Sequence, residues 1–187
     1  MPNPRLATRY AKSLIDLSIE RGQLENVYAD MQWLNRVTVS NPDFVNVLRS
    51  PIIKADKKIK IVEAVISGTV SELTLAFTRL LINKGRESNF PEIISAFITQ
   101  YKVYKNIHTI KLTTATEVSD AMKEAIINQV KKSGGFENIE LQTAVDEKLI
   151  GGFVLQAGDQ LIDASIAYDL KTIARQFENN DFIYKIR

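Results

Sequence analysis

The feature that most constrains the fold of this chain is a change in hydrophobic period near Asn106. Before Asn106, apolar residues recur three and four positions apart, a spacing that places them on one face of an α-helix. After it, segments such as 139–145 alternate apolar and polar residues, as half-buried strands do. A chain of 187 residues can form two small domains. We therefore predict a helical N-terminal domain over 1–105 and a small α/β C-terminal domain over 106–187.

The first part of the chain predicts six helices, which is enough for an all-α bundle. Their apolar stripes cover 6–15, 24–38, a short segment from 42, 55–66, 73–81 and 90–104. Asn41 and Pro42 predict the cap and first residue of the third helix. Thr69 to Glu72 fits a capping box before the fifth helix, and Gly85 predicts its end.

The second part predicts the order β-α-β-β-β-α. Residues 107–115 are rich in β-branched side chains, and Ser119 is expected to cap the following helix. Two further strands, 151–156 and 161–163, are expected to pair across the turn at 157–160. A last amphipathic helix carries Ile166, Leu170, Ile173, Ala174 and Phe177.

Composition leaves little material for catalysis. The chain has no cysteine and one histidine, which removes disulfides, thiolate metal sites, most zinc sites and most acyl-transfer triads. We expect no catalytic residue, no metal site and no cofactor. The lack of cysteine fits a reducing compartment, and the N-terminus lacks the apolar core of a signal peptide. No apolar run is long enough for a membrane span, so we expect a soluble intracellular chain that meets a membrane only through another protein.

Charge differs between the two predicted domains. Up to Lys105 there are 15 Lys+Arg against 10 Asp+Glu, and from Asn106 onward there are 9 against 12. The net charge of +2 is therefore the sum of a basic part and an acidic part. This asymmetry suggests two units with different surroundings.

Three sequence features resemble chemical sites. The glycines of 151–159 precede a strand rather than a helix, so close packing and a hairpin turn are favoured over phosphate binding. Asp163 is favoured as a helix cap over an acid–base group. His108 lacks a partner at a recognisable spacing and is expected to be structural or at the surface.

The lysines from Lys54 to Lys60 allow two interpretations. They could form a basic patch for nucleic acid or anionic lipid. However, Asp56 and Glu63 interrupt the run and no aromatic side chain lies beside it, which favours an ordinary solvated helix face. A nucleic-acid-binding module therefore remains the alternative function, recognisable by salt-dependent retention on RNA or DNA.

Some helices carry more apolar side chains than one buried face needs. Leu17 and Ile19 lie off the main stripe of the first helix, and Leu75 and Ile82 lie off that of the fifth. Such a surplus is typical of a surface that receives a partner helix.

Three segments give the chain a family resemblance. Arg9–Leu14 resembles the opening R-Y-A-K-A helix of the delta subunits of bacterial F-type ATP synthases, relatives of the mitochondrial oligomycin-sensitivity-conferring subunit. Asn83–Arg86 with Phe90-Pro91 is similar to that family's N-x-G-R-x-x-x-[FL]-P link. Asp146–Leu170 matches its C-terminal motif almost throughout, apart from Ala164, where glycine is frequent.

The resemblance implies a non-catalytic stator subunit of the proton-translocating synthase. The N-terminal domain would bind the N-terminal helices of the alpha subunits in the catalytic head, and the C-terminal domain the C-terminal ends of the b subunits in the peripheral stalk. One copy per synthase would lie on the cytoplasmic side of the bacterial inner membrane, without binding nucleic acid or forming an obligate homo-oligomer. Rotor torque could then drive ATP synthesis.

By analogy with the family, we place the site for the alpha N-terminal helix on two helices. Its residues are Tyr10, Ser13, Leu14, Leu17, Phe77, Leu80 and Lys84. The C-terminal motif is expected to be architectural, through Gly151, Gly152, Gly158, Asp159 and Asp163.

Overall fold

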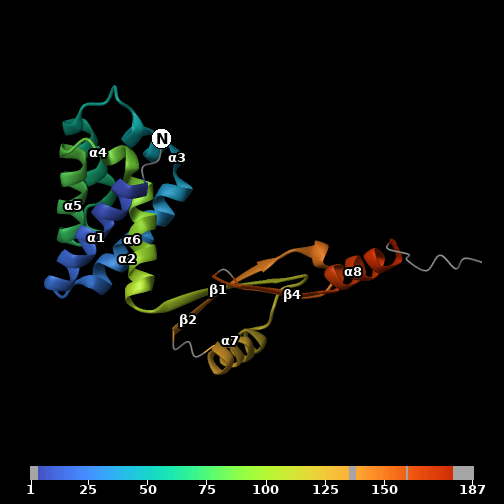
Figure 1. The fold of residues 1–187 in the computed structure, drawn as a ribbon. Coiled ribbons are helices and arrows are strands. Elements are labelled where there is room, and N and C mark those ends of the chain that lie inside the picture. Colours follow the sequence, from blue (N-terminus) through green and yellow to red (C-terminus); the bar gives the residue numbers. More distant parts are fainter. Residues whose placement is uncertain (1–3, 135–137, 159, 179–187) are drawn as a thin grey trace, which may run out of the picture. The chain divides into compact units, whose positions relative to one another are not determined.

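The computed structural model describes residues 4–134, 138–158 and 160–178. Its internal contacts divide the chain into two compact units, Met1–Tyr104 and Lys105–Arg187 (Figure 1). The described residues of the first unit are helical, whereas the second unit combines helices with a sheet. The predicted combination of a helical N-terminal part and an α/β C-terminal part is confirmed.

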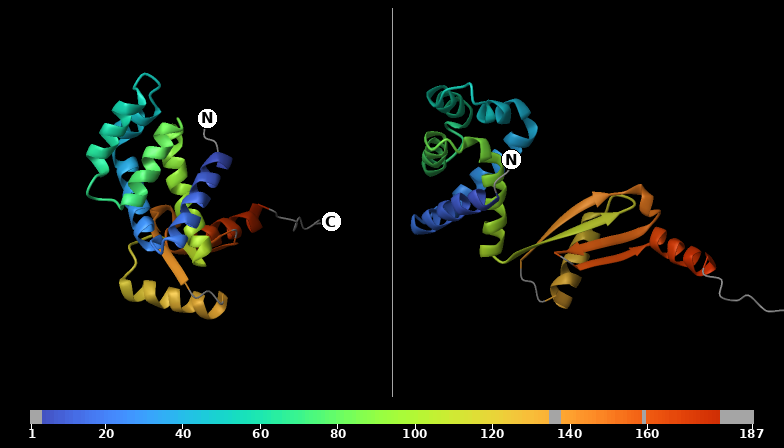
Figure 2. Two further views of the ribbon diagram at one scale, coloured as in Figure 1. Left: turned by 90° about the vertical axis from the view of Figure 1, so that its left-hand side faces the viewer. Right: turned by 45° about the horizontal axis from the view of Figure 1, so that its top comes forward.

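The first unit contains six α-helices and one short 3-10 helix among its described residues. In chain order they are α1 (Pro4–Glu20), α2 (Leu24–Ser40), α3 (Pro42–Arg49), α4 (Ala55–Ile66), α5 (Glu72–Asn83), η1 (Glu87–Asn89) and α6 (Phe90–Tyr104). α6 packs along α1 and α2, and two views show it beside α1 (Figure 2). Its inward side chains are buried: Phe90, Ile93, Ile94, Phe97 and Tyr101. Each such side chain contributes about 1.5–3 kcal/mol when fully buried, so α6 anchors the core.

A ring contact joins α2 to α6. Tyr28 and Tyr101 stack with their ring centroids 3.7 Å apart, and the Tyr101 hydroxyl donates a hydrogen bond of 2.5 Å to Glu25. Burial, together with this hydrogen bond to a carboxylate, raises the pKa of Tyr101 well above its ordinary value. The phenol therefore stays protonated and keeps donating.

The start of α5 differs from the predicted capping box. Ser71, not Thr69, is the N-cap, and its hydroxyl accepts from the Thr74 amide at 3.4 Å. The carboxylate at this helix end comes from buried Asp30 of α2, which accepts from the Ser71 amide at 2.9 Å, the Ser71 hydroxyl at 2.6 Å and the Thr74 hydroxyl at 2.7 Å. A residue 41 positions away in sequence thus replaces the local glutamate, which a short sequence pattern cannot reveal.

Two other helix ends follow their sequence signals. Pro42 is the first residue of α3 after Asn41, although the Asn41 side chain donates to Val37 O at 3.1 Å instead of capping α3. Gly85 follows α5 with φ of 64°, and its amide donates to Ile82 O. This left-handed backbone suits glycine because it has no Cβ.

The described residues of the second unit form, in order, a strand, a helix, three strands and a helix. Its elements are β1 (Ile107–Thr114), α7 (Asp120–Gly134), β2 (Asn138–Val145), the 3-10 helix η2 (Glu147–Leu149), β3 (Gly152–Ala157), β4 (Gln160–Ser165) and α8 (Ile166–Glu178). The sheet order is β2-β1-β3-β4. β1 and β2 are parallel and joined through α7, whereas β1–β3 and β3–β4 are antiparallel.

One face of this sheet is apolar because of the strand register. Ile110 lies opposite Leu141 and Ala157, and Leu112 lies opposite Leu155. Directly opposed residues point to the same face, and Ile110 and Leu112 are both 0% exposed. α7 packs against β2 and shares a pocket with Phe153 on this face. α7 therefore covers the β2 side of the apolar face.

Candidate partner-binding surfaces

α1 carries an outward row of predicted site residues. Tyr10, Ser13 and Leu17 recur at three- and four-residue intervals, so they share one side of the helix. Tyr10 and Leu17 are half-buried and Ser13 is exposed. The Ser13 hydroxyl donates to Arg9 O at 3.0 Å, which leaves a small, internally satisfied side chain at the centre of the row.

Leu14 does not face outward, although it was predicted to contact the partner. It is 1% exposed and belongs to the buried face of α1 with Ala7, Ala11 and Ile15. A fully buried side chain cannot contact a partner directly. Leu14 therefore packs in the core behind the row formed by Tyr10, Ser13 and Leu17. The buried face of α1 lies one position away from the row, because helical periodicity places Leu14 about 100° from Ser13.

On α5 the buried face is not the stripe that the sequence indicated. Thr74, Thr78 and Ile82 are buried with Leu73 and Leu81, whereas Leu80 is 45% exposed and Phe77 half-buried. The two threonines can be buried because each hydroxyl is satisfied: Thr74 donates to Asp30, and Thr78 donates to Thr74 O at 2.8 Å. Phe77 and Leu80 are thereby left on the outer side, with exposed Lys84 one turn further on.

The predicted site residues lie on two helices. α1 packs mainly on α6, and α5 packs mainly on α4. A pocket of about 350 Å³ on this unit lies elsewhere, between the first turns of α1 and α6, and is lined by Pro4, Ala7, Thr8, Pro91, Glu92, Ser95 and Ala96.

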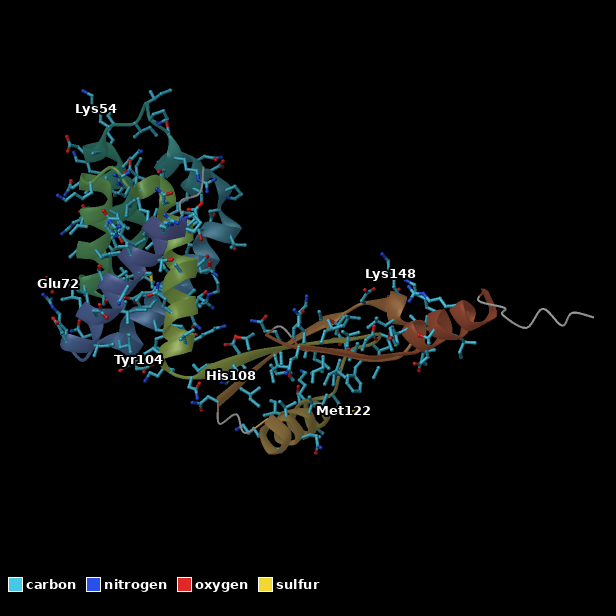
Figure 3. The ribbon with its side chains drawn as sticks, in the orientation of Figure 1. Lys54, Glu72, Tyr104, His108, Met122 and Lys148 are labelled. Carbon is cyan, nitrogen blue, oxygen red and sulfur yellow. The ribbon has the colours of Figure 1, made fainter. Side chains whose placement is uncertain are left out.

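The lysine run at the start of α4 is not a continuous basic patch. Lys58 is 3% exposed, and its ammonium group donates to Leu48 O and to Glu87, each at 2.7 Å. Lys54, Lys57 and Lys60 are exposed, and Figure 3 shows Lys54 at the outer end of the unit. The expectation of a solvated face is wrong for Lys58, and its neutralisation by Glu87 also weakens the nucleic-acid alternative.

The glycines of the C-terminal motif allow close packing in the second unit. Gly152 has φ of 74°, and a Cβ there would overlap Ala164 O on the neighbouring strand. A Cβ at Gly151 would lie 2.7 Å from Ile166 Cδ1. Gly158 has φ of 57° with open space around it, and Asp159 lies outside the described residues. Gly152 is thus a position of close backbone approach, Gly151 packs against the Ile166 side chain, and Gly158 is a turn position.

Asp163 takes part in the start of α8 without being its cap. Its carboxylate accepts from the Ser165 amide at 3.0 Å, and the Ser165 hydroxyl accepts from the Tyr168 amide at 3.2 Å. Ser165, immediately before Ile166, therefore occupies the capping position. Asp163 is a positioning residue for that cap.

The second unit has a pocket of about 560 Å³ beside its motif glycines. It is lined by Thr114 to Ser119, Met122, Ile126 and Ile150 to Phe153. Met122, Ile150 and Phe153 are not among the predicted site residues. The apolar spacing of 122–130 and the motif around Ile150 were visible in the sequence, but their meeting depends on the sheet register.

Other described groups add no reactive site. His108 is half-buried, with Nε2 3.2 Å from Asn106 Oδ1. The described residues include no cluster of three metal-ligating side chains. None of the described helices has the length and apolarity that crossing a bilayer requires.

Comparison with known proteins identifies the family. A sequence model described as "ATP synthase delta (OSCP) subunit" matches residues 6–177. The chain belongs to this family. Among the relatives, "ATP synthase subunit delta" of Cytophaga hutchinsonii is 38% identical and the match covers 95% of this chain and 96% of the relative. The protein of the same name in Christiangramia forsetii is 30% identical over the full length of both.

The fold also matches a solved structure. A chain in the cryo-EM structure of the Toxoplasma gondii mitochondrial ATP synthase hexamer superposes with a TM-score of 0.71, covering 92% of this chain and 97% of that chain at 20% identity. As a member of the delta (OSCP) family, this chain is a non-catalytic subunit of ATP synthase and part of a membrane-associated complex.

Proposed function

We propose that this subunit is the stator joint between the catalytic head and the peripheral stalk of the synthase. The helical unit binds the N-terminal helices of the alpha subunits, and the α/β unit binds the C-terminal ends of the b subunits. One copy per synthase acts on the cytoplasmic side of the inner membrane. Holding the head against the turning rotor lets torque drive ATP synthesis.

The observation that carries the proposal is the outward apolar side of α5. Phe77 and Leu80 point away from the core even though two threonines are buried in their place. Full burial of a large apolar side chain contributes about 1.5–3 kcal/mol, and a partner that covers these two side chains gains the part of that energy that their remaining exposure leaves. Tyr10 and Leu17 on α1 offer a second apolar row around small Ser13.

The chemistry of these rows suits a helix as the partner. A helix presents side chains at intervals of three and four residues, which match the spacing of Tyr10, Ser13 and Leu17. A joint under mechanical load requires slow dissociation, which a buried aromatic anchor such as Tyr10 provides more effectively than exposed charges.

The test is calorimetric titration of the full chain with a synthetic peptide of the alpha N-terminal segment. Tyr10→Ala and Leu80→Asp should each weaken binding more than about tenfold, equivalent to about 1.4 kcal/mol. Val39→Asp is the matched control, because Val39 is an exposed apolar residue at the end of α2. An affinity unchanged from that of the control, in variants that remain folded, would refute this placement of the alpha site.

A further inference from the structure

We infer that the α/β unit holds a stalk helix along one continuous apolar surface. This surface, the stalk seat, consists of the pocket residues Met122, Ile150 and Phe153 and the α8 residues Ile166, Leu170 and Ile173. The inference rests on the proposed function, since it takes the stalk to be the partner of this unit. It adds which residues hold the helix and what chemistry that helix must have.

The first half of the seat is the part of the apolar sheet face that α7 leaves uncovered. α7 packs against β2 and leaves the β3 side of the apolar face open. The resulting pocket of about 560 Å³ is lined by Met122 of α7 and Phe153 of β3, and Figure 3 shows Met122 on α7. Both side chains are exposed, and Ile150 at the pocket rim is 64% exposed.

The second half is the outer stripe of α8. Ile166, Leu170 and Ile173 are spaced four and three residues apart, so they share one side of the helix, and all three are exposed. The stripe meets the pocket at Gly151. This glycine lines the pocket, and a Cβ there would lie only 2.7 Å from Ile166 Cδ1. The two halves therefore form one surface.

α8 cannot itself fill the pocket. β4 ends at Ser165 and α8 begins at Ile166, with no connecting residue between them. The Ser165 cap and a 3.1 Å hydrogen bond from the Ile166 amide to Gly151 O fix the direction in which the helix leaves the strand. Folding back over the sheet would need a reversing loop of a few residues. Within the part of the chain that the structure describes, α8 therefore leaves the pocket unfilled, and we assign the pocket to a helix of another chain.

The shape and charge of the seat define that occupant. A helical stripe packs best against the ridge of another helix, which indicates an amphipathic helix with apolar residues three and four positions apart. Exposed Glu117 lines the pocket, and exposed Asp146 and Glu147 precede Ile150 together with one exposed cation, Lys148. On α8, exposed Asp169 and Lys171 flank Leu170 and balance each other. From Asn106 onward acidic residues outnumber basic ones by 12 to 9. Basic side chains beside the apolar stripe of the partner would complement this charge.

The experiment titrates the full chain with a peptide of the C-terminal helix of the b subunit from the same synthase. Met122→Lys and Leu170→Lys should each weaken binding more than tenfold, because they replace apolar contact with a charge that repels a basic partner. Leu161→Lys is the matched control. Leu161 is 62% exposed, but it pairs with Gln156 and so lies on the opposite face of the sheet. The control should bind like the unmodified chain.

The possible results separate the seat from the proposed function. If the unmodified chain binds the peptide and both seat variants bind as tightly as Leu161→Lys, the seat is wrong and the stalk role stands. If the unmodified chain does not bind b at all, both are overturned. Sedimentation of the chain alone tests a second copy as the occupant: a dimer that Met122→Lys dissociates would also overturn the inference.

The chain has no cysteine, so a single introduced cysteine can be labelled with a fluorophore. Its emission provides a second readout that does not depend on affinity. A fluorophore on Phe153→Cys should change its emission when the b peptide binds, whereas one on Leu161→Cys should not. Equal responses at both positions would contradict the seat.

Discussion

At the scale of single residues, Lys58 shows how far a residue's role can depart from its sequence setting. It lies among lysines that are exposed, yet its own ammonium group is buried against Glu87 and Leu48 O. The sequence shows a cluster of positive charge. The structure shows a buried ion pair between α4 and η1, whose partner lies 29 residues further along the chain.

Removing this ammonium group should destabilise the helical unit. We expect Lys58→Met to lower the free energy of unfolding by about 3 kcal/mol, because it leaves the Glu87 carboxylate buried without its cation. Lys57→Met, at an exposed neighbour, should change it by less than about 0.5 kcal/mol. Urea denaturation followed by circular dichroism measures both, and equal effects of the two changes would contradict the buried pair.

At the scale of elements, the strand β3 depends on a glycine at its first position. Gly152 has φ of 74° and lies against the backbone of β4, where a Cβ would overlap Ala164 O. The sequence predicted close packing at this position, and Gly152 does lie against β4. It could not say which backbone approaches, because that contact follows from the pairing of Gly152 with Ser165.

A side chain at this position should therefore disrupt the hairpin. We expect Gly152→Ala to lower the stability of the α/β unit by about 3 kcal/mol, from the left-handed backbone and the overlap together. Gly158→Ala also meets a positive φ but has open space around it, so it should cost about 1 kcal/mol. Hydrogen exchange at the β3 and β4 amides is the measurement, and equal protection in the two variants would rule out the steric contribution.

The helix α5 shows the limit of periodicity at the same scale. The sequence correctly predicted a helix there and its end at Gly85. Its buried side was predicted from apolar residues alone, whereas Asp30 and two satisfied threonines determine the side that is buried in the structure. Hydrogen bonding across helices thus outweighed hydrophobic patterning.

At the scale of the whole molecule, the chain consists of two compact units with opposite charge balance. The change of hydrophobic period near Asn106 indicated this organisation. Asn106 itself has φ of 53° between α6 and β1, a conformation that asparagine tolerates better than most residues. Two self-contained units are what a connector between two assemblies requires.

The helical unit should bind the head without the other unit. A chain ending at Lys105 should unfold cooperatively and bind the alpha N-terminal peptide within about twofold of the full chain, because each unit has its own core. Calorimetry on both chains provides the comparison. A loss of more than tenfold in a folded truncation would show that the α/β unit contributes to the alpha site.

The sequence by itself determined the elements and the family of this protein. Helical and alternating periods, the glycine at 85 and the motif of 146–170 depend on neighbours within a few positions, so they can be read locally. The tertiary structure alone decided which faces are inside: the burial of Leu14 and Lys58, the outward turn of Leu80, and the pocket at Met122 and Phe153. The physical reason is that burial depends on contacts between residues far apart in the chain, and those contacts exist only after the helices and strands have packed.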